Sequence, residues 1–282
     1  MNLPAYETKE QDVLDYQLPN DTRITIHQDS SSPDSTGRTI WLGGQVLSVY
    51  LHDLLKSVSP FATSSNSKSK TSRQRVVDVG AGTGLTSLSL ASMGYDVLST
   101  DLDLIVDGVL QRNIKANESN LRINGSSNQP RLETKVLDWF KEPKDWEWNQ
   151  EGGVKEPLQP PFDLIVSADT IYDPELSQPL LRTLHRLSSP SPSPRNSSST
   201  PIPTVYIALE ARDPELVSAF LESAEKDWNF KCSRVDHKKL KKLVESKESG
   251  LGWEDEAVWE GVEIWKLKLR KVVAKKENRL QR

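Results

Sequence analysis

Residues 76–90, VVDVGAGTGLTSLSL, constrain the fold more than any other stretch of the chain. A run of β-branched residues ends in three alternating glycines, Gly80, Gly82 and Gly84, and an apolar pattern typical of a helix follows. Glycine lacks a Cβ atom, so the chain can turn tightly there and a ligand can touch the backbone. The pattern therefore predicts a strand, a ligand-binding turn and a helix, as in the first unit of a parallel α/β sheet.

Strand and helix patterns alternate along the rest of the chain. Apolar and β-branched runs predict strands at residues 75–80, 95–101, 132–139, 162–169 and 204–211. Helical patterns lie at residues 101–117, 173–187 and 213–228, and the last two begin with Asp-Pro, a typical helix start. This alternation predicts a doubly wound, mostly parallel sheet, and residues 257–269 add a strand that can insert antiparallel.

The length of 282 residues fits one large α/β domain with extensions. We expect an N-terminal extension with a β-hairpin at residues 1–40, the main domain at 41–270 and a basic tail at 271–282. Segments rich in Ser and Pro at residues 57–75 and 188–203 are poor in apolar side chains, which predicts surface loops.

Composition argues against several classes of protein. The net charge of −4 provides no global field for nucleic acid. A single cysteine, Cys232, excludes a disulfide within the chain, and the four histidines have no metal-ligand spacing, so we expect no metal site. No apolar run is long enough to cross a bilayer, and the N-terminus is acidic rather than signal-like. We therefore expect a cytoplasmic protein without a membrane partner, with a nuclear location left open.

Two cofactor classes use a glycine turn of this kind. A dinucleotide fingerprint needs a third glycine at position 85, where this chain has Leu85. The alternative is S-adenosylmethionine, for which Asp78 inside the first strand and Asp101 at the end of the second provide carboxylates. A carboxylate like that of Asp101 accepts hydrogen bonds from ribose hydroxyls, but NAD sites use the same contact, so it does not discriminate.

The third strand ends in Asp138 and Trp139. An acid beside an indole suits an adenine, because the carboxylate can accept from the exocyclic amine and the ring can border the purine. The competing interpretation is a core tryptophan beside an exposed aspartate, since tryptophan is highly buried on average.

Several segments together are specific to one family. TGRTIWLGGQVLSVYL (residues 36–51), the glycine turn, VLDW (136–139), DTIY (169–172) and YIALEAR (206–212) resemble the family-16 methyltransferase-like proteins, within the seven-strand S-adenosylmethionine-dependent methyltransferases. Most characterised members of that family are protein-lysine N-methyltransferases. The resemblance runs from about Thr36 to Leu269, and the chain departs from it in the two Ser-rich insertions and in Leu102-Asp103.

This resemblance implies a class I methyltransferase (Rossmann-like) fold with a seven-stranded sheet and a short N-terminal β extension, with 41–270 as the methyltransferase domain. It also implies S-adenosylmethionine as cofactor, a protein substrate carrying the target lysine, and a monomer. The implied catalytic residues are Asp169 and Tyr172, and the implied cofactor-binding residues are Trp41, Asp78, Gly80, Gly82, Gly84, Asp101, Asp138, Trp139 and Ala168.

Roles follow for the side chains near the transferred methyl group. We expect Asp169 to orient the incoming amine and Tyr172 to wall its channel with an aromatic face. Trp41 would border the methionine end of the cofactor, with Gly43 and Gly44 allowing close approach. The competing interpretation of each is structural: a turn before the helix at residue 173 for Asp169 and Tyr172, and a hydrophobic anchor for Trp41.

Other functions remain open at this point. Glu210 and Arg212 either line the substrate mouth or form an ordinary surface ion pair. A small-molecule N-methyltransferase and a non-catalytic S-adenosylmethionine-binding module would share most of these features. An enzyme acting on nucleic-acid bases is disfavoured, because the fourth strand ends in DTIY without the two prolines of the N/D-P-P-Y motif.

Overall fold

The computed structural model describes residues 1–31, 36–58, 73–122, 128–148, 157–189 and 202–271. Most of the two Ser-rich segments, and the tail from residue 272 onward, lie outside the described residues, so the loop and tail predictions are not tested. Within the described ranges no helix combines the length and the apolar character needed to cross a membrane.

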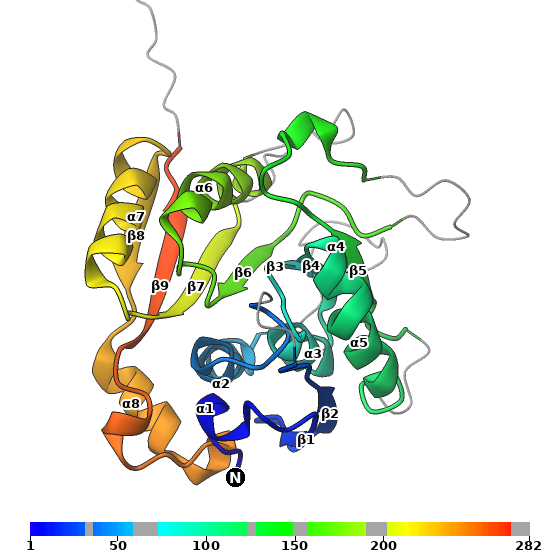
Figure 1. Cartoon of the computed structure of the whole chain (residues 1–282). Coiled ribbons are helices and arrows are strands. Elements are labelled where there is room, and N and C mark those ends of the chain that lie inside the picture. Colours follow the sequence, from blue (N-terminus) through cyan, green and yellow to red (C-terminus); the bar gives the residue numbers. More distant parts are fainter. Residues whose placement is uncertain (32–35, 59–72, 123–127, 149–156, 190–201, 272–282) are drawn as a thin grey trace, which may run out of the picture.

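Seven strands form the central sheet, in the order β5-β4-β3-β6-β7-β9-β8 (Figure 1). Neighbouring strands from β5 to β7 are parallel, whereas β9 runs antiparallel to both β7 and β8. This arrangement confirms the predicted class I, doubly wound α/β fold. The strands are β3 Arg75–Val79, β4 Asp96–Asp101, β5 Leu132–Val136, β6 Leu164–Ala168, β7 Thr204–Glu210, β8 Phe230–Arg234 and β9 Val262–Leu269.

The last strand confirms the antiparallel insertion but begins later than residue 257. A short 3₁₀ helix at Glu256–Val258 precedes it, and Gly261, with a φ of 82°, makes the turn into the strand. Strand β8 was not predicted as a separate element. Its burial alternates only weakly, so the sequence carries little strand signal there.

The helices are α1 Ala5–Thr8, α2 Leu42–Leu55, α3 Leu85–Ser92, α4 Asp103–Ile105, α5 Gln111–Asn117, α6 Pro174–Ser188, α7 Pro214–Lys226 and α8 His237–Glu245. Both Asp-Pro starts are confirmed: Asp173 accepts a hydrogen bond from the Glu175 N–H at 2.8 Å, and Asp213 from the Glu215 N–H at 3.0 Å. The single helix expected over 101–117 is instead α4 joined to α5 by a π-helical turn at Val106–Leu110.

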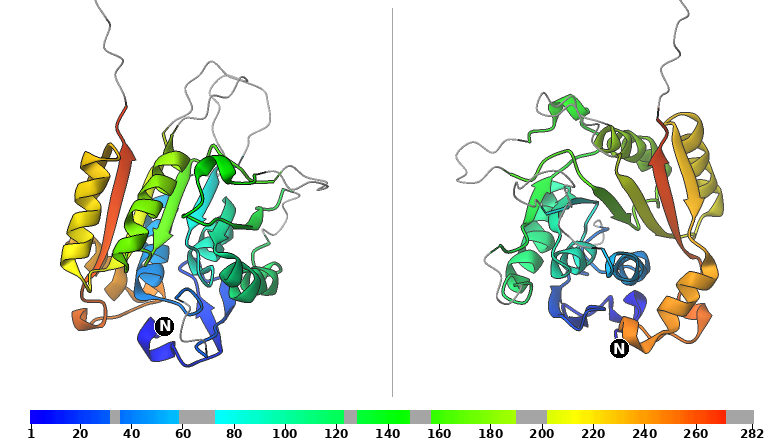
Figure 2. Two further views of the ribbon diagram at one scale, coloured as in Figure 1. Left: turned by 45° about the horizontal axis from the view of Figure 1, so that its top comes forward. Right: turned by 180° about the vertical axis from the view of Figure 1, so that it is seen from behind.

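Helices cover both faces of the sheet. Figures 1 and 2 show α2, α3 and α5 on one face and α6 and α7 on the other. Two hydrophobic clusters fill these layers: one joins α2 and α3 to Tyr206 and Ala208 of β7, and the other joins α6 and α7 to Val205 and Ile207 of the same strand. The alternation of side chains along β7 therefore assigns its residues to the two faces.

An N-terminal hairpin, β1 Val13–Gln17 and β2 Arg23–His27, packs beside α5. Two buried asparagines of α5 hold its edge: Asn117 Oδ1 accepts from the Thr25 N–H at 2.9 Å, and Asn113 Oδ1 accepts from the His27 N–H at 2.7 Å. Asn113 Nδ2 also donates to the Thr83 carbonyl at 2.9 Å. The same helix therefore fixes both the hairpin and the end of the glycine turn.

Candidate functional site

The glycine turn lies at the carboxyl end of β3, between β4 and β6. Gly80, Gly82 and Gly84 all have positive φ angles, of 72°, 55° and 85°. A Cβ on Gly80 would lie 2.6 Å from Thr170 Cγ2, and one on Gly82 would lie 3.0 Å from the Gly37 carbonyl oxygen. Two neighbouring segments thus approach the bare backbone of the turn. The turn itself has a backbone conformation that residues with a Cβ rarely adopt.

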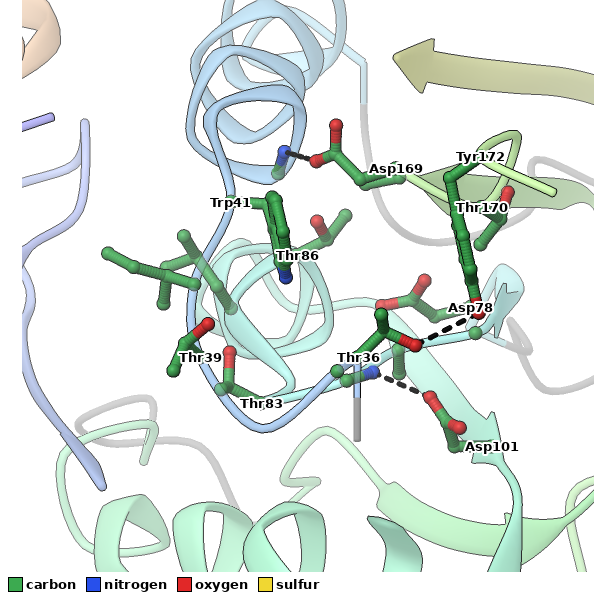
Figure 3. A pocket seen from close by; sticks show the side chains of 18 of the residues that line it. Thr36, Thr39, Trp41, Asp78, Thr83, Thr86, Asp101, Asp169, Thr170 and Tyr172 are labelled. Carbon is green, nitrogen blue, oxygen red and sulfur yellow. Dashed lines mark hydrogen bonds between the residues drawn. The ribbon is translucent and has the colours of Figure 1, made fainter. Parts of the chain in front are cut away.

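A cleft with a volume of about 270 Å³ opens above this turn (Figure 3). All predicted site residues except Gly84 and Asp138 line it: Trp41, Asp78, Gly80, Gly82, Asp101, Trp139, Ala168, Asp169 and Tyr172. They come from the start of α2 and from the ends of β3, β4, β5 and β6. Ligands of open α/β sheets bind at this edge, so the cleft is the candidate active site.

The two exceptions have local structural contacts. Gly84 begins α3, and a Cβ there would lie 2.8 Å from Leu110 Cδ1, so it serves the packing of the π-helical turn. Asp138 accepts a hydrogen bond from the Phe140 N–H at 2.9 Å and does not line the cleft. Its contact with an adenine stays a prediction.

Two acidic side chains reach the cleft from adjacent strands. Asp78 is buried and accepts from Ser87 Oγ at 2.7 Å, and Ser87 Oγ accepts in turn from Ser99 Oγ at 2.7 Å. Asp101 accepts from the N–H groups of Gly82 and Leu102, each at 2.8 Å. Burial raises the pKa of Asp78 to about 7 and that of Asp101 to about 6. A ligand that offers a positive charge or hydroxyl donors would stabilise the ionised form of these carboxyl groups and lower their pKa values.

Asp169 makes a contact that was not predicted, and its role toward the incoming amine stays a prediction. It follows β6 with a φ of 56°, and its carboxylate accepts from the Gly44 N–H at 3.0 Å, at the start of α2 (Figure 3). A Cβ on Gly43 would lie 2.5 Å from both carboxylate oxygens, so Gly43 makes room for Asp169. No side chain of its own segment caps α2, because the N-cap residue is Trp41. Asp169 is therefore the cap of this helix.

Burial is also the largest influence on the titration of Asp169, and it raises the pKa of this carboxyl to about 7. The N–H groups of α2 and the nearby Arg212 lower this pKa, whereas the charge of Glu210 raises it. The cleft thus carries three carboxyl groups that are all protonated more readily than ordinary aspartates.

Tyr172 lies across the cleft from α2. Its side chain is largely exposed, and its hydroxyl is 2.9 Å from the hydroxyl of Thr36 (Figure 3). The contact joins the loop after β6 to the segment before α2. Thr36 was not predicted as a site residue, and neither were four other threonines that line the cleft: Thr39, Thr83, Thr86 and Thr170. Thr36 and Thr39 precede Trp41 in the resembling segment, Thr83 lies in the glycine turn, Thr86 in the helix after it and Thr170 in the DTIY segment. Proximity to those motifs was therefore the available signal.

The outer part of the cleft gathers charged groups around Trp41. The guanidinium carbon of Arg212 lies 4.9 Å from the centre of the indole ring, and Lys9 Nζ lies 5.8 Å from it. Arg212 also pairs with Glu210 at 2.5 Å, and both line the cleft. The ion pair predicted for Glu210 and Arg212 is therefore confirmed, whereas their role at a substrate mouth stays a prediction. No group of potential metal ligands occurs among the described residues.

Comparison with known proteins identifies relatives of this chain. The sequence profile of a family described as lysine methyltransferase matches residues 18–227. The chain is 27% identical over 198 residues to methyltransferase-like protein 22 of Mus musculus, covering 65% of this chain and 45% of the relative. It is 29% identical over 182 residues to ribosomal lysine N-methyltransferase 5 of Lachancea thermotolerans, covering 57% of this chain and 50% of the relative.

A third curated relative is protein-lysine N-methyltransferase EFM2 of Saccharomyces cerevisiae, 28% identical over 164 residues, covering 57% of this chain and 36% of the relative. The chain thus spans half or less of the length of these three relatives. Among solved structures, magnesium protoporphyrin IX methyltransferase from Synechocystis, with bound S-adenosylhomocysteine, has a TM-score of 0.42 at 13% identity, covering 81% of this chain and 84% of that one.

Proposed function

Because the chain belongs to the lysine methyltransferase family, we propose that it is an S-adenosylmethionine-dependent protein-lysine N-methyltransferase. The observation that carries the proposal is the cleft itself. It combines a bare glycine turn with three desolvated carboxyl groups, those of Asp78, Asp101 and Asp169, around one cavity of about 270 Å³.

The charge of the cleft suits this donor better than a dinucleotide. S-adenosylmethionine carries a sulfonium cation, an α-ammonium group and a ribose diol, all of which are attracted to carboxylates. A dinucleotide would instead bring a pyrophosphate into a cleft that also holds the carboxyl groups of Asp78 and Asp169. Apart from Asp101, whose contact NAD sites share, these carboxyl groups therefore add a physical argument to the absence of a glycine at position 85.

The proposed binding residues follow from their positions in the cleft. Asp101 holds the ribose hydroxyls, Asp78 faces the amino-acid end, the backbone at Gly80 and Gly82 accommodates the adenosyl group, and Trp139 borders the adenine. Further proposed cofactor-binding residues are Asp138, Gly84 and Ala168. When bound, the cofactor supplies an electrophilic methyl group on a positively charged sulfur.

The chain contributes orientation and desolvation to the transfer. A lysine is protonated near pH 7, so the site must favour its neutral form, and a desolvated position near a second positive charge lowers the pKa of an amine. Asp169 fixes the start of α2 and with it Trp41, while Tyr172 closes the opposite wall. Holding the amine aligned with the methyl group is the main gain available to such an enzyme.

The remaining expectations belong to the same proposal. The substrate is a protein with a target lysine, in keeping with the names of two relatives. We also propose that the chain is monomeric and cytoplasmic, with access to the nucleus. Its proposed parts are an extension at 1–40, a methyltransferase domain at 41–270 and a tail at 271–282.

Two measurements test the proposal. Titration calorimetry on the full chain should show saturable binding of S-adenosylmethionine and S-adenosylhomocysteine. Tritium-labelled methyl transfer into a lysate of cells lacking this protein should then label a band whose lysine modification mass spectrometry identifies. Cofactor binding without transfer to any protein would favour the non-catalytic binding module, and the absence of cofactor binding by folded protein would refute the proposal.

A further inference from the structure

The aromatic face of Trp41 attracts cations. Two basic side chains from distant parts of the sequence, Lys9 and Arg212, lie 5.8 Å and 4.9 Å from its ring. Both distances are within the range at which the electron-rich face of an indole stabilises a positive charge, about 6 Å. Trp41 also lines the cleft, so this cation-binding face belongs to the wall of the active site.

Strand pairing brings a carboxylate to the same place. The Asp169 N–H donates to the Ala208 carbonyl at 2.9 Å, which aligns the end of β6 with β7. Ala208 packs in the cluster on the α2 face of the sheet, and side chains alternate along a strand, so Glu210 lies on that face two residues later. Glu210 lines the cleft, and its charge influences the titration of Asp169.

The present partner of Glu210 is easily exchanged. Arg212 pairs with Glu210 at 2.5 Å, but the Arg212 side chain is 60% exposed whereas that of Glu210 is 22% exposed. Exposed ion pairs contribute little to stability because water and salt compete for both charges. Replacing the guanidinium by another cation would therefore cost the fold little, while the carboxylate and the indole would stay in position.

We infer that Glu210 and the face of Trp41 form the entry site for the cationic side chain of the substrate, and that Arg212 occupies this site until the substrate displaces it. The inference rests on the proposed function. It makes Glu210 a substrate-binding residue and Arg212 an internal competitor. It also limits the substrate to a chain that presents a cationic side chain, since a neutral or anionic group gains nothing from this pair, and a lysine ammonium meets this requirement.

The test uses two analogues of the cofactor in which nitrogen replaces the sulfur. One carries a 4-aminobutyl arm on this nitrogen and the other a butyl arm, so the two differ in the terminal ammonium alone. Titration calorimetry on the full chain gives their affinity ratio, and S-adenosylhomocysteine, measured beside them, reports an intact cofactor site. The variants are Glu210→Gln and Arg212→Gln, with Arg234→Gln as control, because Arg234 is also a partly exposed arginine in an ion pair but does not line the cleft.

The wild-type chain should bind the ammonium analogue about tenfold more tightly than the butyl analogue. Glu210→Gln should reduce this ratio to about twofold or less, Arg212→Gln should raise it severalfold, and Arg234→Gln should leave it unchanged. A wild-type ratio near one, or an undiminished ratio in Glu210→Gln, would overturn the entry site. An unchanged or smaller ratio in Arg212→Gln would overturn the displacement. If S-adenosylhomocysteine fails to bind the folded wild-type chain, the proposed function fails instead.

Discussion

Gly43→Ala tests whether Asp169 caps α2 from a distant strand. The added Cβ would lie 2.5 Å from both carboxylate oxygens and 2.7 Å from Asp169 Cγ. Contacts of this length do not persist, so the carboxylate must move away from the helix start and give up its 3.0 Å hydrogen bond from the Gly44 N–H. The side chain of Trp41, the N-cap residue, makes no capping hydrogen bond that could replace the one from Asp169.

The expected loss follows from the kind of bond that is broken. A hydrogen bond to a charged group contributes about 1.5–3 kcal/mol, which agrees with the cost of removing a helix cap. Alanine offsets up to about 1 kcal/mol of this loss through its higher helix propensity. We therefore expect Gly43→Ala to lower the free energy of unfolding by about 1–2 kcal/mol.

The neighbouring Gly44→Ala is a matched control. A Cβ on Gly44 would lie 3.9 Å from Ala168 Cβ and 4.0 Å from Thr86 Oγ1, both ordinary contacts. It should therefore leave stability unchanged or raise it by up to about 1 kcal/mol. The two variants should differ by about 1–3 kcal/mol, or roughly 2–12 °C in Tm for a chain of this size.

Thermal unfolding of the ligand-free variants, followed by circular dichroism at pH 8, measures this difference. The difference should narrow below pH 7, because the pKa of Asp169 is about 7 and the charge-assisted bond requires the ionised carboxylate. Equal melting temperatures for the two variants, or a lower one for Gly44→Ala, would refute the capping role of Asp169.

Three further predictions concern the cofactor and the loops. Asp101→Ala should weaken S-adenosylmethionine binding by about 1.5–3 kcal/mol, or roughly 10- to 150-fold, in calorimetry, and wild-type affinity would contradict its assignment. Burial raises the pKa of Asp78, Asp101 and Asp169 to about 7, 6 and 7, so the folded state binds protons more tightly than the unfolded chain. The stability of the ligand-free protein should therefore fall from about pH 4 to pH 7, while cofactor affinity should rise through pH 6–7 with proton release, seen as a buffer-dependent enthalpy; a flat profile of affinity against pH would argue against it. Deleting residues 191–199, which lie outside the described residues, should change Tm little, because loop length has a small entropic cost, and a large drop would show that they are packed.

The parts of the fold that could be predicted are those encoded locally. The strand that leads into the glycine turn, and the helices after Asp173 and Asp213, have their start signals within a few residues. The cleft was predictable for the same reason, because ends of parallel strands meet at one edge of the sheet. Strand β8 was missed because its position depends on pairing with β9, which lies later in the chain.

Contacts between distant residues account for the rest. Asn113 and Asn117 lie four positions apart beside the apolar stripe of α5, yet nothing in the sequence shows that they hold the edge of β2. The glycine at position 43 was predicted to admit the cofactor, whereas it admits the carboxylate of Asp169, far away in the sequence. The sequence can thus predict that a glycine lets another group come close to the backbone, but it does not indicate which group this is.

The cap on α2 also affects how activity data on Asp169 should be interpreted. Because its carboxylate holds the start of the helix, and Trp41 is the N-cap residue there, removing it would displace a wall of the cleft as well as a charge. A loss of transfer in Asp169→Ala is therefore not evidence for a chemical role by itself. Asp169→Asn keeps a hydrogen-bond acceptor of the same shape and removes the charge, so the comparison of the two variants separates the positioning of α2 from the electrostatics of the site.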